Sequence, residues 1–185
     1  MFELFYHPIY TYGIDKRSRF PRDRYRLTKE ALDQLDVDIH FVRPRMAEIN
    51  DLYFAHDRAY VDSFLNGSLS IKERRRIGLQ PWNDQIIDRT RYIIGGSLGA
   101  LESAIASNGI AGNMAGGTHH AHYSEGSGYC IFNDLAICAK VARRNHERIN
   151  NVLIIDLDFH KGDGTASMLS NDHDFFTFSM HCDSN

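Results

Sequence analysis

Two carboxylates and an imidazole alternate at the end of the most apolar run in the sequence, Asn151-Val-Leu-Ile-Ile-Asp156-Leu-Asp158-Phe-His160. Alternate residues of a strand project to the same side, so we expect Asp156, Asp158 and His160 to share one face or its continuation. Charged groups this close repel one another unless a cation lies between them. Oxygen and imidazole donors suit zinc or ferrous iron, so the spacing favours a metal site. The alternative is a polar strand end whose acids are solvated or cap the turn at Gly162–Gly164.

A second set of candidate groups lies in the loop Gly116-Gly117-Thr118-His119-His120-Ala121-His122. Neutral imidazoles accept protons near pH 7, so His119 and His120 are candidates for acid–base work. Adjacent side chains diverge, and each imidazole therefore needs its own orienting partner, which Asp156 and Asp163 can supply. The alternative is a glycine-rich turn that contains incidental histidines.

A further glycine-rich segment, Gly126-Ser127-Gly128-Tyr129-Cys130, leads towards Asn133-Asp134. Glycine lets the backbone approach a ligand closely, and Tyr129 can form the wall of a slot. Cys130 has no activating partner beside it in the sequence. It is more typical of a small buried side chain than of a nucleophile.

The elements that must position these groups alternate between strand and helix patterns. We expect strands at 2–6, 38–42, 110–114, 151–158 and 175–181, and helices at 22–35, within 46–67, and at 83–107, 133–146 and 165–169. This alternation predicts a three-layer α/β fold with a mostly parallel central sheet. Since 151–158 is apolar almost throughout, we expect that strand to be buried on both faces. Ligands collect at the carboxyl ends of such strands, where the candidate groups lie.

The strongest helix signal covers 83–107. Asn83 is the expected N-cap, and Asn108-Gly109 is the expected stop. The pair Gly95-Gly96 inside the helix costs about 1 kcal/mol per glycine relative to alanine. We therefore expect another element to pack closely against that pair.

Bulk composition excludes several classes. The 185 residues are enough for one domain, 1–185, and the net charge of −3 does not favour a nucleic-acid partner. The basic cluster Lys72–Arg76 is interpreted as a solvated helix face or loop. The N-terminal residues carry an acid where a signal peptide would carry positive charge, and no segment approaches the apolar run needed to span a bilayer, so we expect neither a signal peptide nor a membrane role. The three cysteines form no C-x-x-C pair, which favours a cytoplasmic location.

Taken together, the motifs resemble the histone deacetylase / acetoin-utilisation / acetylpolyamine amidohydrolase superfamily. The motifs that carry the resemblance are His119-His120, Gly128-Tyr129-Cys130 to Asn133-Asp134, Asp156 to Gly164, and Ser179-Met180-His181. Features nearer the N-terminus look like the bacterial or class-IV-like branch: His7-Pro8, Phe20-Pro21 and Ala55-His56-Asp57-x-x-Tyr60-Val61. The resemblance spans nearly the whole chain and implies an arginase/deacetylase-like fold.

The resemblance implies a role for each acid–base group. His119 and His120 would be the catalytic histidines beside the reacting water. Asp156 would hold His119, and Asp163 would hold His120. The activity implied is metal-dependent hydrolysis of an acylated lysine or a related acylated amine, which releases acetate and a free amine.

The resemblance also implies ligands and a substrate channel. Asp158 and His160 would be two of the three protein ligands to Zn2+ or Fe2+. Gly128 and Tyr129 would line the tunnel for the acylated amine. A structural K+ would be held by the Ser179 hydroxyl and by backbone carbonyls, namely those of Asp156, Asp158, His160 and Met180.

The chain departs from the family at its end. The family's third metal ligand, an aspartate, and its transition-state donor, usually a tyrosine, come after the position of Asn185. We therefore expect 1–185 to be the N-terminal portion of a larger domain, incomplete at the C-terminus, that alone binds metal weakly and catalyses poorly. The alternative is a non-catalytic metal- or acyl-ligand-binding fragment or subunit. An arginase-like hydrolase is disfavoured by His119-His120, and the sequence gives no oligomeric state.

Overall fold

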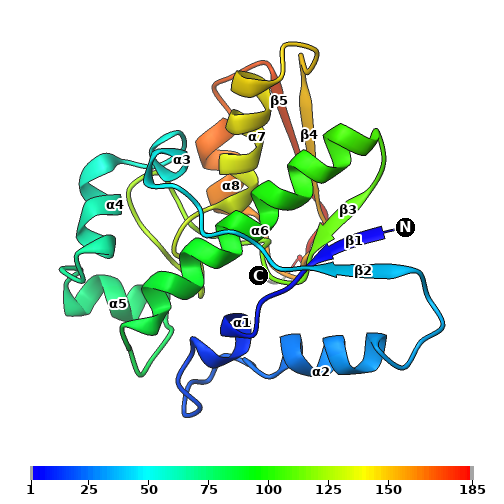
Figure 1. Cartoon of the computed structure of the whole chain (residues 1–185). Coiled ribbons are helices and arrows are strands. Elements are labelled where there is room, and N and C mark those ends of the chain that lie inside the picture. The colour runs from blue at the N-terminus through cyan, green and yellow to red at the C-terminus, as the bar shows by residue number, and fades with distance from the viewer. Residues whose placement is uncertain (1, 184–185) are drawn as a thin grey trace.

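The computed structural model describes residues 2–183 as an α/β structure in which every described strand pairing is parallel (Figure 1). One sheet has the order β2-β1-β3, and β4 pairs with β5 in a second sheet. The strands are β1 (Phe2–Phe5), β2 (Ile39–Val42), β3 (Ala111–Asn113), β4 (Val152–Asp156) and β5 (Phe175–Ser179). The predicted α/β class with parallel pairing is confirmed.

Helices pack around these strands, and the long α6 crosses the middle of the molecule (Figure 1). The helices described are α1 (Ile9–Tyr12), α2 (Arg24–Leu32), α3 (Ile49–Tyr53), α4 (Arg58–Leu65), α5 (Ile71–Ile77), α6 (Gln85–Ser107), α7 (Asp134–Asn145) and α8 (Asp163–Leu169). The sequence pattern did not predict α1, which is a single turn after Pro8.

The two glycines inside α6 allow close packing, as predicted. A Cβ atom at Gly95 would lie 1.8 Å from the carbonyl oxygen of Arg45. A Cβ atom at Gly96 would lie 2.4 Å from the hydroxyl oxygen of Tyr10. The close packing that these glycines permit offsets their low helix propensity.

The predicted N-cap of α6 is wrong. The backbone carbonyl of Asn83 accepts the N–H of Ile86 at 3.2 Å, whereas its side-chain oxygen is buried without a hydrogen-bond partner. The helix therefore begins after Asp84, whose backbone is already helical and whose side chain makes no capping bond. At the other end, Asn108 adopts a left-handed conformation and stops the helix as expected.

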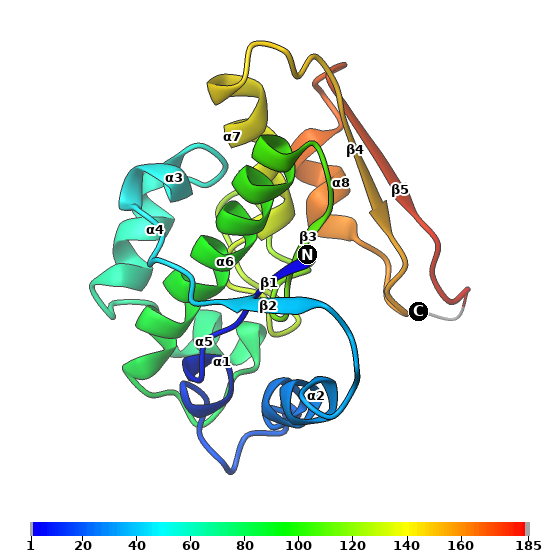
Figure 2. The same cartoon turned by 45° about the vertical axis from the view of Figure 1, so that its right-hand side comes forward.

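The prediction that 151–158 is buried on both faces is also wrong. Figure 2 shows α7 and α8 on one side of the β4–β5 pair only. On that side Ile154 is buried, whereas Leu153 and Ile155 are 61% and 59% exposed. Phe176 and Phe178 of β5 are exposed on the same sheet. An apolar run of this kind is typical of a strand with helices packed on both faces of its sheet. Among residues 2–183, helices pack on only one face of the β4–β5 sheet.

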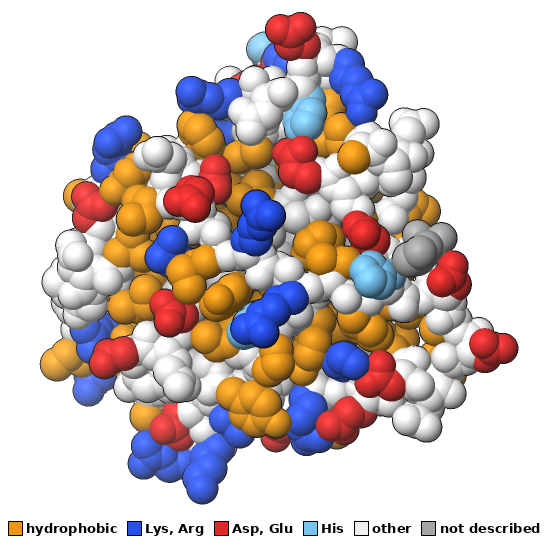
Figure 3. Space-filling model, in the orientation of Figure 1, with side chains coloured by type: hydrophobic (Ala, Val, Ile, Leu, Met, Phe, Trp, Pro, Cys, Tyr) orange, Lys and Arg blue, Asp and Glu red, His pale blue; other side chains and the backbone are white. Residues whose placement is uncertain are grey.

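Charged side chains of both signs are interspersed on the face drawn in Figure 3. The basic cluster predicted to be a helix face or loop forms α5 (Ile71–Ile77). Its Arg76 pairs with Glu125 and donates to the carbonyl of Gly126. Among residues 2–183, none of the helices has the length and apolar character needed to cross a bilayer.

A buried histidine ties the turn before α4 to the loop that precedes α7. His56 is 1% exposed, and its Nε2 accepts the backbone N–H of Asn133 at 2.9 Å. Its Nδ1 lies 3.2 Å from the carbonyl oxygen of Tyr123, to which it can donate. Burial lowers the pKa of His56 from the usual 6.5 to about 4. The folded protein therefore holds this imidazole neutral.

We expect this histidine to make the folded state less stable in acid. Between pH 6.5 and about 4 the unfolded chain binds a proton that folded His56 does not, so the free energy of unfolding falls as the pH falls. The loss approaches roughly 3 kcal/mol at the lower end of this window. Urea unfolding at several pH values should show a shallower pH dependence for His56→Gln. His146, which pairs with Glu102 at the surface, provides the control His146→Gln. Equal slopes for wild type and His56→Gln would contradict the assignment.

Candidate active site

The acids and imidazole at the end of β4 lie where the strand gives way to a loop. β4 ends at Asp156, and the Asp156 carboxylate then accepts the N–H of Asp158 at 3.0 Å. The Asp158 carboxylate in turn accepts the N–H of His160 at 2.8 Å. The strand thus ends before Asp158, and the carboxylates of Asp156 and Asp158 bend the chain through their bonds to backbone N–H groups. Beyond the strand, the Asp158 and His160 side chains still face one cavity. The turn separates a half-buried Asp156 from an exposed Asp158 and His160.

His119 is the buried member of the tandem pair. It is 5% exposed, and its Nδ1 lies 2.6 Å from a carboxylate oxygen of Asp156. Gly162 makes room for this carboxylate, since a Cβ atom there would lie 2.2 Å from the same oxygen. A carboxylate on Nδ1 fixes the proton on that nitrogen and leaves Nε2 as the acceptor. Nε2 faces Asp158, whose carboxylate oxygen is 3.8 Å away.

His120 forms a second, more exposed pair. Its Nδ1 lies 2.8 Å from a carboxylate oxygen of Asp163, the first residue of α8. Partial burial raises the pKa of Asp163. The bonds from His120 and from the N–H of Gly164 outweigh that effect, and the pKa stays below its usual value. The two imidazole centroids are 4.1 Å apart, so the two rings lie side by side at the site.

The buried carboxylate of Asp134, for which the sequence predicted no role, shapes the loop before the histidines. Asp134 is 2% exposed and accepts four hydrogen bonds from two elements. The donors are the Ser97 hydroxyl at 2.6 Å, the Gly117 N–H at 3.2 Å, and the Thr118 N–H at 2.8 Å and hydroxyl at 2.7 Å. Gly116, with φ of +139°, passes so close that a Cβ atom there would lie 2.5 Å from the carboxylate. The sequence signals for Asp134 were its place in the motif from Gly128 to Asn133-Asp134 and its position at the start of a predicted helix.

We expect Asp134→Asn to damage the site by loosening this loop. Either orientation of the asparagine amide would set its NH2 group against a backbone N–H, that of Gly117 or that of Thr118. A buried donor left without an acceptor costs about 1–3 kcal/mol, which urea unfolding should detect. Ser97→Ala removes only one of the four bonds and should cost less. An Asp134→Asn protein as stable as the wild type would contradict this account.

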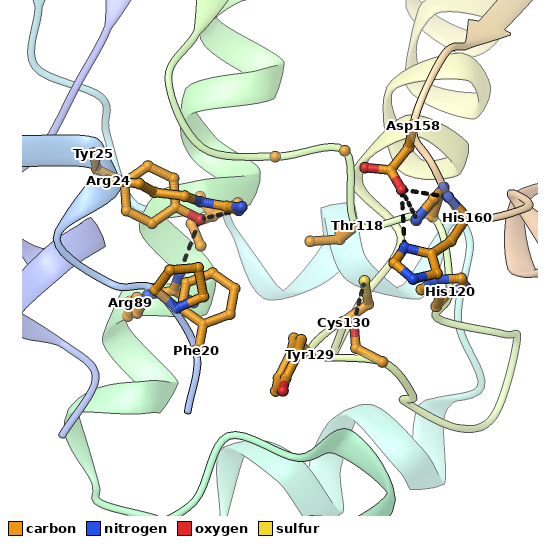
Figure 4. Close-up of a pocket in the computed structure, with 16 residues that line it drawn as sticks. Phe20, Arg24, Tyr25, Arg89, Thr118, His120, Tyr129, Cys130, Asp158 and His160 are labelled. Carbon is orange, nitrogen blue, oxygen red and sulfur yellow. Dashed lines mark hydrogen bonds and ion pairs between the residues drawn. The ribbon is translucent and has the colours of Figure 1, made fainter. Parts of the chain in front are cut away.

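A cavity of about 440 Å³ opens beside the histidines (Figure 4). Its lining residues come from α2 and the segment before it, from α6, and from the loops that follow β3 and β4. They are Phe20, Pro21, Arg24, Tyr25, Arg89, Ile93, Gly116, Gly117, Thr118, His119, His120, Gly128, Tyr129, Cys130, Asp158 and His160. The structure thus brings the predicted metal, catalytic and channel residues to one cavity, apart from Asp156 and Asp163, which lie behind the histidines. The residues from α2 and α6 were not predicted, because no local pattern links them to the histidines.

The segment Gly128-Tyr129 forms part of the cavity wall. A Cβ atom at Gly128 would lie 2.6 Å from Cδ2 of His120, so glycine lets the loop contact that ring. Tyr129 has a left-handed backbone with φ of +67°, held by a bond from its N–H to the carbonyl of Ile77 at 2.7 Å. Its ring meets Phe20 edge to face, with centroids 5.3 Å apart. The Phe20 and Tyr129 rings together form an apolar part of the cavity wall.

Cys130 lies in the same wall, but its environment disfavours reactivity. Burial raises the pKa of its thiol to about 12, and the thiol donates to the carbonyl of Gly128. The thiolate, which is the nucleophilic form, is therefore suppressed near neutral pH.

The donors predicted for a divalent metal are Asp158 and His160. A carboxylate oxygen of Asp158 lies 3.2 Å from Nδ1 of His160, and both side chains face the cavity. Partial burial raises the pKa of Asp158. The bond from the His160 N–H and the nearby His119 outweigh it and keep the pKa below its usual value. Within residues 2–183, no cluster of three His, Cys, Asp or Glu side chains is placed to hold a metal ion. The described residues thus fit two ligands of a metal site.

The segments predicted to hold K+ also come together. Asp156 pairs in register with Ser179, and the Asp156 carbonyl accepts the N–H of Met180 at 2.9 Å. The Ser179 hydroxyl accepts the N–H of Gly162 at 3.2 Å. A cavity of about 210 Å³ lies beside them. The K+ assignment, which also involves carbonyls of Asp158 and His160, stays a prediction.

Comparison with known proteins supports one family. The profile of the histone deacetylase domain matches residues 18–185. The chain is 39% identical over its whole length to an uncharacterized protein of Picosynechococcus sp., of which it covers 61%. It is 32% identical over 92% of its length to the acetoin utilization protein AcuC of Staphylococcus aureus, and it covers 46% of that protein. It is 30% identical over 86% of its length to a "probable deacetylase" of Methanothermobacter thermautotrophicus, covering 48%. The chain thus spans about half the length of these relatives.

Proposed function

Because this chain belongs to the histone deacetylase family, we propose that the protein containing it hydrolyses the amide bond of an acylated lysine or a related acylated amine. In this reaction water adds to the acyl carbon, the C–N bond breaks, and a carboxylate and an amine leave. The chain spans about half of its curated relatives, so we assign the activity to the whole protein.

The observation that carries this proposal is the double histidine–carboxylate arrangement beside the cavity. His119 with Asp156 at 2.6 Å, and His120 with Asp163 at 2.8 Å, each have Nδ1 engaged. Both Nε2 atoms are therefore available for proton transfer with a molecule in the cavity. Hydrolysis of an amide needs a group that takes a proton from water and a group that returns one to the leaving amine. Two imidazoles held in this way can serve both needs.

Asp158 and His160 would hold a Zn2+ or Fe2+ ion, because one offers a carboxylate oxygen and the other an imidazole nitrogen at the same cavity. When bound, such an ion polarises the amide carbonyl and makes water more acidic. The chain's own residues supply the rest. His119 and His120 hold and move protons, and Gly128 and Tyr129 confine the alkyl chain of the amine.

The direct test is a panel of acyl-lysine peptides and acylated small amines, assayed with the purified whole protein before and after chelation and metal replacement. We expect turnover that is lost on chelation and regained with zinc or ferrous iron. The 1–185 polypeptide, assayed in parallel, should turn over these substrates poorly. Absence of turnover by a folded, metal-loaded whole protein on every member of the panel would refute the proposal.

A second candidate is a non-catalytic protein that binds metal or an acyl ligand. It rests on the same cavity, whose lining includes two metal donors, Asp158 and His160, and which has room for a ligand. Under this candidate, the whole protein would bind acylated amines measurably in titration calorimetry but would release no carboxylate.

A further inference from the structure

Two basic segments of the chain lie beside the Phe20–Tyr129 part of the cavity wall. One is the segment 15–23 between α1 and α2, which contains Phe20. The other is α5, whose Ile77 carbonyl accepts the N–H of Tyr129 at 2.7 Å. Because the two aromatic rings meet edge to face, the segment and the helix come together at this wall. Figure 1 places both at the lower left of the molecule, and Figure 3 shows Lys and Arg side chains along that edge.

The Phe20 and Tyr129 rings lie where the cavity meets solvent. Tyr129 is 40% exposed, and Pro21, which also lines the cavity, is exposed. A Cβ atom at Gly78, directly after α5, would lie 3.2 Å from the Tyr129 ring, so the helix ends against this ring. The exposed side chains of α5 and of segment 15–23 therefore lie beside the mouth of the cavity.

The two segments hold an excess of positive charge. Together, 15–23 and α5 contain eight basic and three acidic residues. Each acid already has a partner: Asp15 pairs with Arg17, Asp23 lies near Arg22 and Arg26, and Glu73 accepts from Ser70. Four exposed cations remain for which residues 2–183 provide no carboxylate at ion-pair distance: Lys16, Arg19, Lys72 and Arg75. Like charges gathered beside one opening attract a partner of the opposite sign.

We propose that Lys16, Arg19, Lys72 and Arg75, here called the basic rim, bind acidic side chains of a polypeptide that carries the acylated lysine. The substrate class is then a protein or peptide with Asp or Glu close to the modified lysine, and this part rests on the proposed function. An extended peptide rises about 3.3 Å per residue, so acids within three positions of the lysine lie within about 10 Å of it. That distance is comparable to the Debye length at an ionic strength of about 0.1 M, so the rim charges attract such acids at low salt.

The basic rim disfavours the other substrate class that the histidine pairs could serve, the acylated polyamines. A polyamine acylated at one nitrogen keeps at least one other amino group, which is protonated near neutral pH. Such a substrate approaches the mouth of the cavity as a cation, and the rim repels it. An acylated lysine has lost its own charge, and acids beside it supply the sign that the rim attracts. The rim therefore selects acidic peptides over acylated polyamines.

A nucleic acid is a less suitable partner for the same charges. Outside the two basic segments, the chain holds 13 basic and 21 acidic residues. A polyanion longer than the rim therefore meets a surface of its own sign, whereas nucleic-acid binding needs a broad basic patch. A short acidic stretch of polypeptide matches the size of the rim and brings a lysine to the cavity beside it.

The first experiment measures binding without turnover. The whole, metal-loaded protein is titrated with two labelled peptides in which a methylene group replaces the nitrogen of the acylated side chain, so that no amide can be hydrolysed. One peptide has glutamates on both sides of the modified residue, and the other has glutamines. Fluorescence anisotropy should show the acidic peptide binding roughly 10-fold more tightly at low salt, which is the scale of two or three exposed ion pairs. The difference should disappear as NaCl approaches about 0.5 M.

Charge reversal assigns this preference to the rim. Arg19→Glu combined with Arg75→Glu should remove the preference for the acidic peptide, and Arg19→Gln combined with Arg75→Gln should remove about half of it on a logarithmic scale. The matched control is Arg43→Glu combined with Arg45→Glu. These two exposed arginines follow β2 and are not among the cavity-lining residues, and their reversal changes the net charge by the same amount. The control variant should keep the preference. All four positions are exposed, so we expect each variant to fold, which circular dichroism checks.

The second experiment compares hydrolysis of the corresponding amide peptides and of a mono-acetylated polyamine. We expect the ratio of kcat/KM for the acidic peptide to that for the neutral peptide to be roughly 10, mainly through KM, and to approach 1 in Arg19→Glu combined with Arg75→Glu. The acetylated polyamine should be the poorest of the three substrates and should improve in that variant.

Several results would overturn the basic rim. These are equal binding of the two labelled peptides at low salt, an equal loss in the Arg43 and Arg45 control, or displacement of the acidic peptide by a lower concentration of a single-stranded oligonucleotide. A polyamine hydrolysed more efficiently than the acidic peptide would overturn the substrate class. If the acidic peptide binds through the rim but no acylated amine is hydrolysed, the proposed function fails and the basic rim stands.

Discussion

Asp158→Ala in the whole protein should abolish amide hydrolysis and remove most of the bound metal. Asp158 contributes an exposed carboxylate at the cavity, 3.2 Å from His160 and 3.8 Å from His119. Alanine leaves no oxygen donor there, and the two imidazoles cannot replace a hard anionic ligand. We expect kcat/KM to fall by at least roughly 1,000-fold, a loss that excess zinc in the assay does not restore. Metal content by elemental analysis should fall together with activity.

A matched control separates this effect from a general loss of charge. Asp36 is an exposed aspartate in the loop between α2 and β2, on a different part of the chain. Asp36→Ala should keep metal content and turnover at wild-type values. Full activity in Asp158→Ala would remove Asp158 from the site.

Asp156→Asn should give the second large loss, with the fold preserved. The carboxylate fixes the proton of His119 on Nδ1, and asparagine can instead present its NH2 group and favour the other tautomer. Loss of a correctly oriented general base or acid costs roughly 100- to 10,000-fold. The expected result is a fall in kcat with little change in KM, and a changed pH dependence of kcat/KM. Circular dichroism should show an unchanged spectrum.

The exposed pair provides the comparison. The Asp163 side chain is 51% exposed, whereas that of Asp156 is 10% exposed. Water can take part of the role of a missing carboxylate at an exposed site but not at a buried one. Asp163→Asn should therefore lose less activity than Asp156→Asn. The reverse order would show that His120, and not His119, carries the step most sensitive to orientation.

Local patterns predicted the elements that carry the site, because each depends on neighbouring residues. The apolar run before Asp156 predicted a strand, which is β4. Asn133 predicted the start of α7, and its side chain caps that helix by accepting the N–H of Ala136. The need of adjacent imidazoles for separate partners indicated Asp156 and Asp163, and the family resemblance implied that Asp156 holds His119 and Asp163 holds His120. The roles of these residues in catalysis stay predictions.

Long-range packing accounts for what the sequence did not reveal. Arg89 and Tyr25 are 64 positions apart and meet only because α2 packs near α6. Asp134 and Ser97 are 37 positions apart and meet by the packing of α6 against α7. No periodicity or spacing marks such a pair. The turn at Asp158 was not predicted for a different reason. The alternation of polar residues does not show that the carboxylates of Asp156 and Asp158 will accept hydrogen bonds from the backbone N–H groups two residues later.

If residues 1–185 are to be used as a separate scaffold, the exposed apolar side of the β4–β5 pair must first be made polar. Leu153, Ile155, Phe176 and Phe178 project from it at 53–61% exposure. Side chains of this kind, displayed on a flat two-stranded ribbon, invite edge-to-edge and face-to-face association. Substituting threonine, lysine and glutamate at these four positions would retain the strand pairing and give the ribbon a polar, solvated surface. The inward Ile154 and the turn at Asp156 should be left as they are.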